Sequence, residues 1–158
     1  MNIIVGVSDG RTSADAEDVL ATYALGSCIG VMLYDPAVRV GGLLHYQLPS
    51  SAADAERAKE KPLMFADTGM NWIMDQLAQM GAQKKRIRVR LAGGAKMLND
   101  ETMFDIGRRN HAAIRKILFQ NGMFIDKELV GGTTPRTVHL NIADGTLTVK
   151  SNTETITI

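Results

Sequence analysis

The chain contains a single cysteine, Cys28, so no disulfide can form within it. A lone thiol is typical of proteins kept in a reducing compartment, and we expect a cytoplasmic location. No apolar run approaches the roughly 18 residues that a membrane-spanning helix needs. The N-terminal segment lacks the basic start and the long apolar core of a signal peptide. These absences predict a protein that is neither inserted into a membrane nor exported through one.

An excess of charge of one sign is also missing, because 18 lysine and arginine residues balance 17 acidic ones. A net charge of +1 creates no global field that would attract nucleic acid or an anionic membrane, and neither partner is expected. The sequence has no repeats, linkers or low-complexity segments either. With 45% apolar residues it can bury a substantial core, and we predict one domain that spans residues 1–158.

Patterns typical of metal and nucleotide sites are absent as well. Of the three histidines, His111 and His139 have no metal-ligand partner at a diagnostic spacing. The glycine pairs at 41–42, 93–94 and 131–132 do not have the spacing of a phosphate-binding loop, and turns or bulges explain them most simply. We therefore expect no metal, nucleotide or other cofactor.

Hydrophobic periodicity predicts two main helices. Residues 67–80 carry one apolar stripe that ends before Gly81, and residues 105–121 carry a second that ends at Gly122. Residues 50–61 are rich in alanine and alternating charge, which indicates a solvated helix or loop.

Short alternating or β-branched segments predict the strands, whereas residues 8–13 have the composition of a polar turn. The strand segments are residues 3–7, 19–25, 29–34, 39–48, 84–91, 123–130, 137–142 and 146–150. In the segment 84–91, arginines alternate with apolar residues, and we expect Arg86, Arg88 and Arg90 to form a solvent-facing positive side. Strands and helices together predict an α+β protein.

The two strands around the cysteine carry a candidate catalytic site. If residues 35–38 form the loop of a hairpin, Cys28 lies directly opposite His45. The β-carbons of directly paired residues are about 5 Å apart, so the imidazole would be able to take the thiol proton. A slip of one residue, or a bulge at glycines 41–42, would instead place His45 on the other face of the sheet.

Neighbouring residues complete this candidate site. The hydroxyl of Thr22 can accept a hydrogen bond from the second imidazole nitrogen of His45 and fix its tautomer. An imidazolium beside Cys28 would lower the thiol pKa below its free value of about 8.5. Gly26 and Ser27 form the turn before the cysteine, and nothing in the sequence activates the Ser27 hydroxyl over the neighbouring thiol.

These motifs resemble the chemoreceptor glutamine deamidase family CheD, whose members carry a threonine, a Gly-Ser-Cys turn and a Gly-Gly-x-x-His segment followed by Leu-Pro at this spacing. Further matching motifs lie at residues 93–95, 106–110 and 131–136, so the resemblance covers nearly the whole chain. Three positions depart from the pattern, which often has an aromatic residue, an acidic residue and a glycine where this chain has Ala92, Leu129 and Pro135.

The resemblance implies a layered sandwich of mostly antiparallel sheets with the two main helices on one face. It also implies hydrolysis of the side-chain amides of glutamines on the cytoplasmic helices of chemoreceptors, to glutamate and ammonia. Cys28 would attack the amide carbon, and main-chain N–H groups of the turn Gly26-Ser27-Cys28 would hold the oxyanion. His45, oriented by Thr22, would protonate the departing ammonia and then activate water to release the thioester.

Two alternatives stay open at the level of the sequence. In the first, the chain is a binding module of the chemotaxis circuit that docks the phosphatase CheC, with which the resemblance implies a shared surface. In the second, the same thiol site acts on small amides or as a transglutaminase-like enzyme. A lone cysteine is also, in general, more often a buried apolar residue than a nucleophile, so Cys28 gains its significance from His45, Thr22 and the family pattern.

Overall fold

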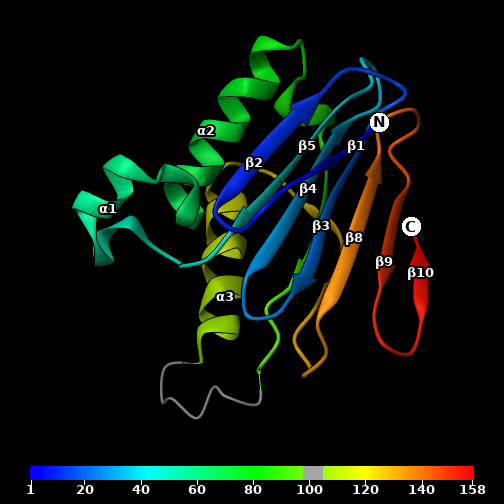
Figure 1. The fold of residues 1–158 in the computed structure, drawn as a ribbon. Coiled ribbons are helices and arrows are strands. Elements are labelled where there is room, and N and C mark those ends of the chain that lie inside the picture. Colours follow the sequence, from blue (N-terminus) through cyan, green and yellow to red (C-terminus); the bar gives the residue numbers. More distant parts are fainter. Residues whose placement is uncertain (98–104) are drawn as a thin grey trace.

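The computed structural model describes residues 1–97 and 105–158 (Figure 1). In this part of the chain, ten strands form two five-stranded sheets. The first sheet has the order β1 (Asn2–Ile4), β3 (Val19–Leu25), β8 (Arg136–Asn141), β9 (Leu147–Lys150) and β10 (Thr155–Thr157). The second has the order β2 (Asp9–Ser13), β5 (Val40–Tyr46), β4 (Ile29–Asp35), β6 (Arg88–Gly93) and β7 (Ile125–Val130). The helices are α1 (Ala55–Glu60), α2 (Ala66–Gln79) and α3 (Ile106–Gln120).

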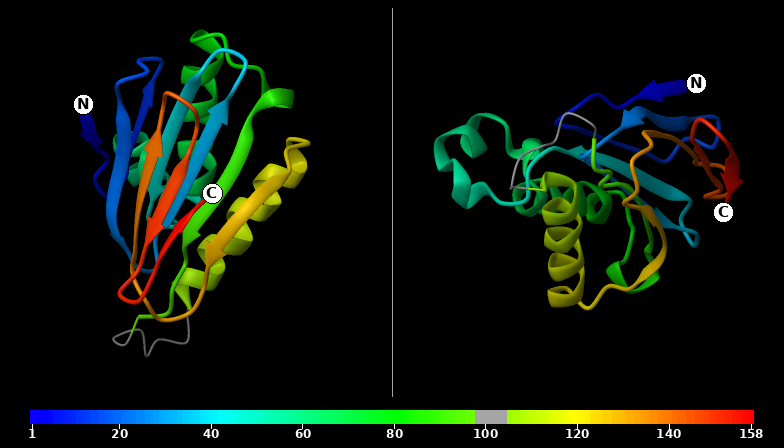
Figure 2. Two further views of the ribbon diagram at one scale, coloured as in Figure 1. Left: turned by 90° about the vertical axis from the view of Figure 1, so that its right-hand side faces the viewer. Right: turned by 90° about the horizontal axis from the view of Figure 1, so that it is seen from below.

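The elements form three layers (Figures 1 and 2). Helices α2 and α3 cover one face of the second sheet, and the first sheet covers the other. One core cluster therefore joins the helices to the second sheet, through residues such as Val31, Ile73 and Ile114. The other lies between the sheets and includes Leu20 and Leu43. The predicted α+β sandwich with its two main helices on one face is confirmed, and only the β1–β3 and β6–β7 pairs are parallel among the described strand pairs.

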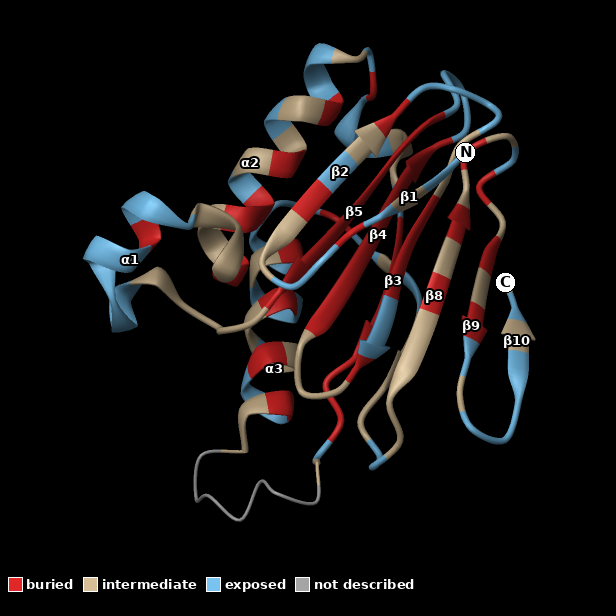
Figure 3. Cartoon of the chain, in the orientation of Figure 1, coloured by how far each residue is buried: buried red, intermediate tan, exposed pale blue. Residues whose placement is uncertain are grey.

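Strands β4 and β5 lie at the centre of these layers, and every residue of both strands is buried (Figure 3). A strand covered on both faces needs apolar or small residues at successive positions rather than strict alternation. Glycines meet this need where neighbours approach closely. A β-carbon at Gly41 would press on Ile142, which follows β8, and one at Gly42 would press on Ile73 of α2. The candidate site residues are attached to these two strands and to β3.

The prediction of a polar turn at residues 8–13 is wrong, because residues 9–13 form the edge strand β2 and pair with β5. An edge strand that is partly solvated carries polar residues, so its composition resembles that of a turn. Gly10 in this strand is buried, and a β-carbon there would touch the indole of Trp72.

The positive face expected for residues 84–91 is also wrong. Residues 84–86 form a 3-10 turn before β6, and Arg86 pairs with the buried carboxylate of Asp35 at 2.9 Å. Arg90 is buried between the sheets, where it donates to the carbonyl oxygens of Gly145 (2.6 Å) and Ile158 (3.1 Å). Arg90 is buried because its side of β6 faces the first sheet rather than water. Of the three arginines only Arg88, at the start of the strand, is exposed.

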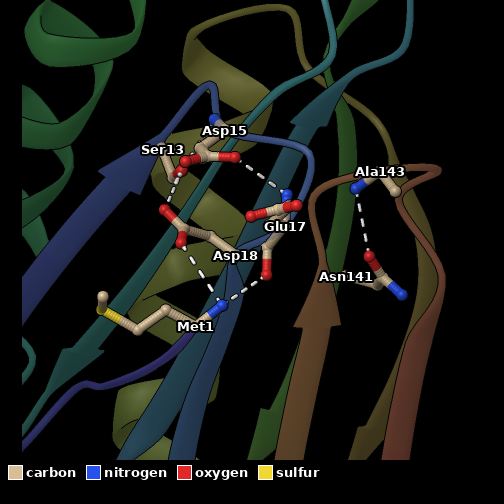
Figure 4. A network of polar contacts seen from close by, with 7 residues as sticks. All are labelled: Met1, Ser13, Asp15, Glu17, Asp18, Asn141 and Ala143. Carbon is tan, nitrogen blue, oxygen red and sulfur yellow. Dashed lines mark hydrogen bonds and ion pairs between the residues drawn. The ribbon is translucent and has the colours of Figure 1, made fainter.

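A polar network holds the N-terminal segment beside β3 (Figure 4). The amino group of Met1 donates to the carbonyl oxygen of Glu17, and the Ser13 hydroxyl donates to Asp18 at 2.7 Å. The Val19 N–H donates to the Met1 carbonyl, which starts the parallel β1–β3 pairing. This pairing continues to Val5, whose N–H donates to the carbonyl oxygen of Ala21. Val5 is thereby fixed next to Thr22. None of the helices in the described part is long and apolar enough to cross a membrane.

Candidate functional site

The hairpin of β4 and β5 is present, but its predicted register is wrong. Asp35 pairs with Val40, so the loop is residues 36–39, and Gly30 rather than Cys28 lies opposite His45. Arg39 adopts a left-handed conformation (φ 54°) that closes the turn one residue later than expected. The strands pair without a break through glycines 41–42, so these residues form no bulge.

The shift of register is two residues, and therefore Cys28 and His45 keep the same side of the sheet. Cys28 is half-buried in the turn before β4 and packs against the core cluster between the sheets. Leu43 belongs to that cluster, and His45, two residues later in β5, points to the same face of the sheet. His45 is only 3% exposed. The two side chains are diagonal neighbours, for which Cα atoms are roughly 7–8 Å apart in an antiparallel pair.

Thr22 of β3 reaches His45 across the space between the sheets, as the sequence predicted. Its Oγ1 lies 2.7 Å from Nδ1 of His45 and 2.6 Å from the carbonyl oxygen of Val5. The carbonyl can only accept, so the threonine hydroxyl donates its proton to Val5. Oγ1 must then accept from His45, which places the imidazole proton on Nδ1. This arrangement leaves Nε2 of His45 with a free lone pair.

The second nitrogen of His45, Nε2, is able to accept a proton. Nε2 is buried and has no hydrogen-bond partner within residues 1–97 and 105–158. Burial lowers the pKa of His45 from 6.5 to about 4, and the carboxylate of Asp9, opposite it on β2, only partly opposes this shift. The imidazole is therefore neutral at pH 7 and able to accept a proton.

The expected lowering of the thiol pKa is contradicted. Burial raises the pKa of Cys28 above its ordinary value, and the main-chain N–H of the same residue offsets this only in part. A neutral His45 supplies no positive charge to stabilise a thiolate. The free protein therefore holds a protonated thiol and a neutral imidazole on the same side of the sheet, not the ion pair that the sequence suggested.

The turn that carries Cys28 is fixed by main-chain contacts with the loop after β6. The N–H of Gly94 donates to the Cys28 carbonyl (2.9 Å), and the N–H of Ala95 donates to the Gly26 carbonyl (2.8 Å). A β-carbon at Gly93 would overlap the carbonyl oxygen of Cys28, and Gly93 has φ of 108°, so this position requires glycine. Arg136 holds the same loop in place by donating to the Gly93 carbonyl (3.2 Å).

Asn110 of α3 is a buried polar residue whose role the sequence motifs did not indicate. Its Nδ2 donates to the carbonyl oxygens of Ser27 (3.0 Å) and Gln47 (2.9 Å), and so it joins the cysteine turn to the end of the histidine strand. Tyr46 donates to the Asn110 carbonyl from the other side. The sequence does contain one signal for this role, because Asn110 lies on the apolar side of α3 with Ile114 and Leu118. A buried amide needs hydrogen-bond partners, so a polar residue at such a position indicates a structural contact.

The remaining histidines lie away from this cluster. His111 contacts Glu128 at 2.6 Å, and the ring of His139 packs edge-to-face against Tyr23. Within the described residues, no group of three or more histidine, cysteine or acidic side chains is placed to hold a metal ion.

The fold and these residues define a layered α+β protein with a cysteine, a histidine and a threonine gathered at one end of its two sheets. Residues 47–151 match the family model described as CheD chemotactic sensory transduction. Curated relatives from Solibacter usitatus, Syntrophus aciditrophicus and Archaeoglobus fulgidus are similar to this chain. The first and third are named probable chemoreceptor glutamine deamidase CheD, and the second has the same name with the number CheD 1. The Solibacter usitatus protein is 50% identical over 95% of this chain and 89% of its own length. The Syntrophus aciditrophicus protein is 48% identical over 96% and 94%, and the Archaeoglobus fulgidus protein is 39% identical over 94% and 92%.

The chain belongs to the CheD family. The segment that the family model matches begins two residues after His45, whereas the matches to these relatives cover more than nine-tenths of the chain.

Proposed function

We propose that the chain is a protein-glutamine deamidase that converts side-chain amides of chemoreceptor glutamines to glutamates and releases ammonia. The observation that carries this proposal is the state of His45. A buried, neutral imidazole has its proton fixed on Nδ1 by Thr22, and its free Nε2 lies on the side of the sheet that bears the only thiol of the chain. The names of the relatives supply the substrate class.

In the first half of the reaction, proton transfer accompanies attack. Nε2 of His45 takes the Cys28 proton as the sulfur bonds to the amide carbon, because the thiol is protonated and the imidazole neutral before substrate binds. Main-chain N–H groups of the turn Gly26-Ser27-Cys28 hold the oxyanion. The imidazolium then gives its proton to the amide nitrogen, which leaves as ammonia from a Cys28 thioester.

In the second half, water replaces ammonia. His45 takes a proton from water as the water oxygen attacks the thioester carbon. The Cys28 sulfur then leaves and takes that proton from His45. The sum is glutamine plus water to glutamate plus ammonia, so no redox partner is needed. Thr22 acts through His45 as a positioning residue, since its hydrogen bond holds the same tautomer in both halves.

The proposal is tested by mass spectrometry of a chemoreceptor cytoplasmic fragment incubated with the full chain. Each deamidated glutamine gains about 1 Da, and ammonia is released in equal amount. A fragment that keeps its mass while it forms a complex with the chain would contradict the enzyme. If a CheC-type phosphatase then bound the chain tightly, the result would favour the binding module instead.

A further inference from the structure

The face between α3 and β7 carries a long surface that the proposed reaction does not use. Its two ends are hollowed. A cavity of about 320 Å³ near the start of α3 is lined by residues that include Lys96, Arg108 and Gly131. A cavity of about 660 Å³ near the end of α3 is lined by residues that include Arg115 and Lys127. Helix α3 and strand β7 lie side by side (Figure 2). Since both contribute to both cavities, we call this surface the α3–β7 groove.

The groove begins beside the cysteine turn. Gly94 lines the first cavity and also donates its N–H to the Cys28 carbonyl. Asn110, in the first half of α3, binds the carbonyl of Ser27. One end of a chain segment that lies in the groove would therefore lie next to the turn that carries Cys28.

Positive charge dominates the helix that forms the groove. Helix α3 contains four arginine and lysine residues and no acidic residue. The acidic groups nearby already have partners, because Glu128 contacts His111, Asp126 accepts from the Val89 N–H at 2.7 Å and Asp105 lies 3.6 Å from Arg108. Arg115, Lys116 and Lys127 make no ion pair within residues 1–97 and 105–158.

The far end of the groove is apolar and exposed. Phe119 and Phe124 are 86% and 85% exposed, the highest values for any aromatic side chain in the described part of the chain. Both line the second cavity. Leaving two phenylalanines in water is unfavourable, and exposed apolar groups rimmed by polar ones are typical of interaction sites. Phe119 follows Arg108 by eleven residues, which is about 16 Å along a helix.

We infer that the α3–β7 groove docks an acidic, amphipathic helical segment of the chemoreceptor substrate. This inference rests on the proposed function for the identity of the partner. The segment has carboxylates beside the target glutamine, which face Arg108, Lys96 and Arg115. Of the cations that these carboxylates face, Lys96 and Arg115 make no ion pair within residues 1–97 and 105–158, whereas Arg108 would exchange its partner Asp105 for the segment. About three helical turns from its carboxylates, the segment has apolar side chains that cover Phe119 and Phe124. The groove therefore selects which glutamines reach Cys28.

Binding is measured without turnover, by fluorescence anisotropy of a labelled chemoreceptor cytoplasmic fragment titrated with the Cys28→Ala protein. Adding Arg115→Glu, or Phe119→Ser with Phe124→Ser, raises the dissociation constant tenfold or more. The matched controls Lys150→Glu, at the exposed end of β9, and Val38→Ser, in the β4–β5 loop, leave it within twofold. Higher salt weakens binding of the parent protein more than that of the Arg115→Glu variant.

Several outcomes overturn the inference. The first is that the groove variants and the parent bind the fragment with the same dissociation constant. The second is that Lys150→Glu weakens binding as much as the groove variants do, and the third is that the parent does not bind the fragment. A dimer of the protein alone that Phe119→Ser with Phe124→Ser dissociates in sedimentation would assign the groove to a second copy. Failure of the proposed function is recognised separately, because the fragment would then bind through the groove yet show no mass gain with the Cys28-containing chain.

Discussion

At the scale of single residues, the protonation state of the site follows from one carbonyl group. The Val5 carbonyl takes the hydroxyl proton of Thr22, Thr22 can then only accept from His45, and His45 is left with its lone pair on Nε2. The Thr22–His45 contact could be expected from the sequence only through the family resemblance, because a threonine in an extended segment is ordinary. The sequence does not predict the role of Val5, because main-chain acceptors carry no sequence signal.

The buried state of His45 makes the stability of the protein depend on pH. The folded-state pKa of about 4 lies below the ordinary 6.5, so the unfolded chain binds a proton in this interval that the folded chain does not. The free energy of unfolding is therefore expected to fall by about 3 kcal/mol as the pH decreases from 6.5 to 4. Urea unfolding at a series of pH values measures this slope.

The variant His45→Gln identifies the source of that pH dependence. Glutamine has no proton to gain, so the His45→Gln slope between these pH values becomes shallower by the contribution of His45. An unchanged slope in His45→Gln would mean that the folded protein accommodates a protonated His45 without cost.

At the scale of elements, a buried carboxylate connects three segments that are distant in sequence. Asp35, at the end of β4, is fully buried and accepts from the N–H groups of Ala37 (3.0 Å) and Gln83 (2.9 Å) and from the guanidinium of Arg86. Burial opposes ionisation, but these bonds outweigh it and lower the pKa of Asp35. Asp35 thus fixes the β4–β5 loop against the connection from α2 to β6.

Replacement of Asp35 by alanine is expected to destabilise the protein by about 3 kcal/mol. Its donors lose a buried acceptor, although the half-buried Arg86 can regain water, which keeps the loss at the lower end for a broken buried pair. Urea unfolding of Asp35→Ala gives the value, and Lys85→Ala, an exposed residue of the same 3-10 turn, serves as the control. A loss below 1 kcal/mol in Asp35→Ala would show that the loop is held by other contacts.

The main helices were predicted within one residue, because an apolar stripe with period 3.6 is an unambiguous local signal. Residues 67–80 and 105–121 correspond to α2 and α3. The hairpin register could not be predicted with equal accuracy. The register requires that Asp35 pairs with Val40. This pairing depends on the left-handed conformation of Arg39 and on the bonds that Asp35 accepts from Gln83 and Arg86, which are distant in sequence.

At the scale of the whole molecule, the site lies between the two sheets, and no single segment contains it. Thr22 comes from the first sheet and His45 from the second, while Cys28 sits in the turn that connects them. The order of the strands is not encoded by local patterns, since alternation says which side of a strand is buried but not what covers it. For this reason Arg90 was expected in solvent and is found between the sheets.

The central claim is that Cys28 is the nucleophile of a glutamine deamidase. It is tested most directly by the rate at which one chemoreceptor cytoplasmic fragment gains about 1 Da per glutamine with the parent chain and with Cys28→Ala, compared side by side. We expect mass gain with the parent chain and none above background with Cys28→Ala, while both proteins unfold at the same urea concentration. Equal rates of mass gain for the two proteins would contradict it.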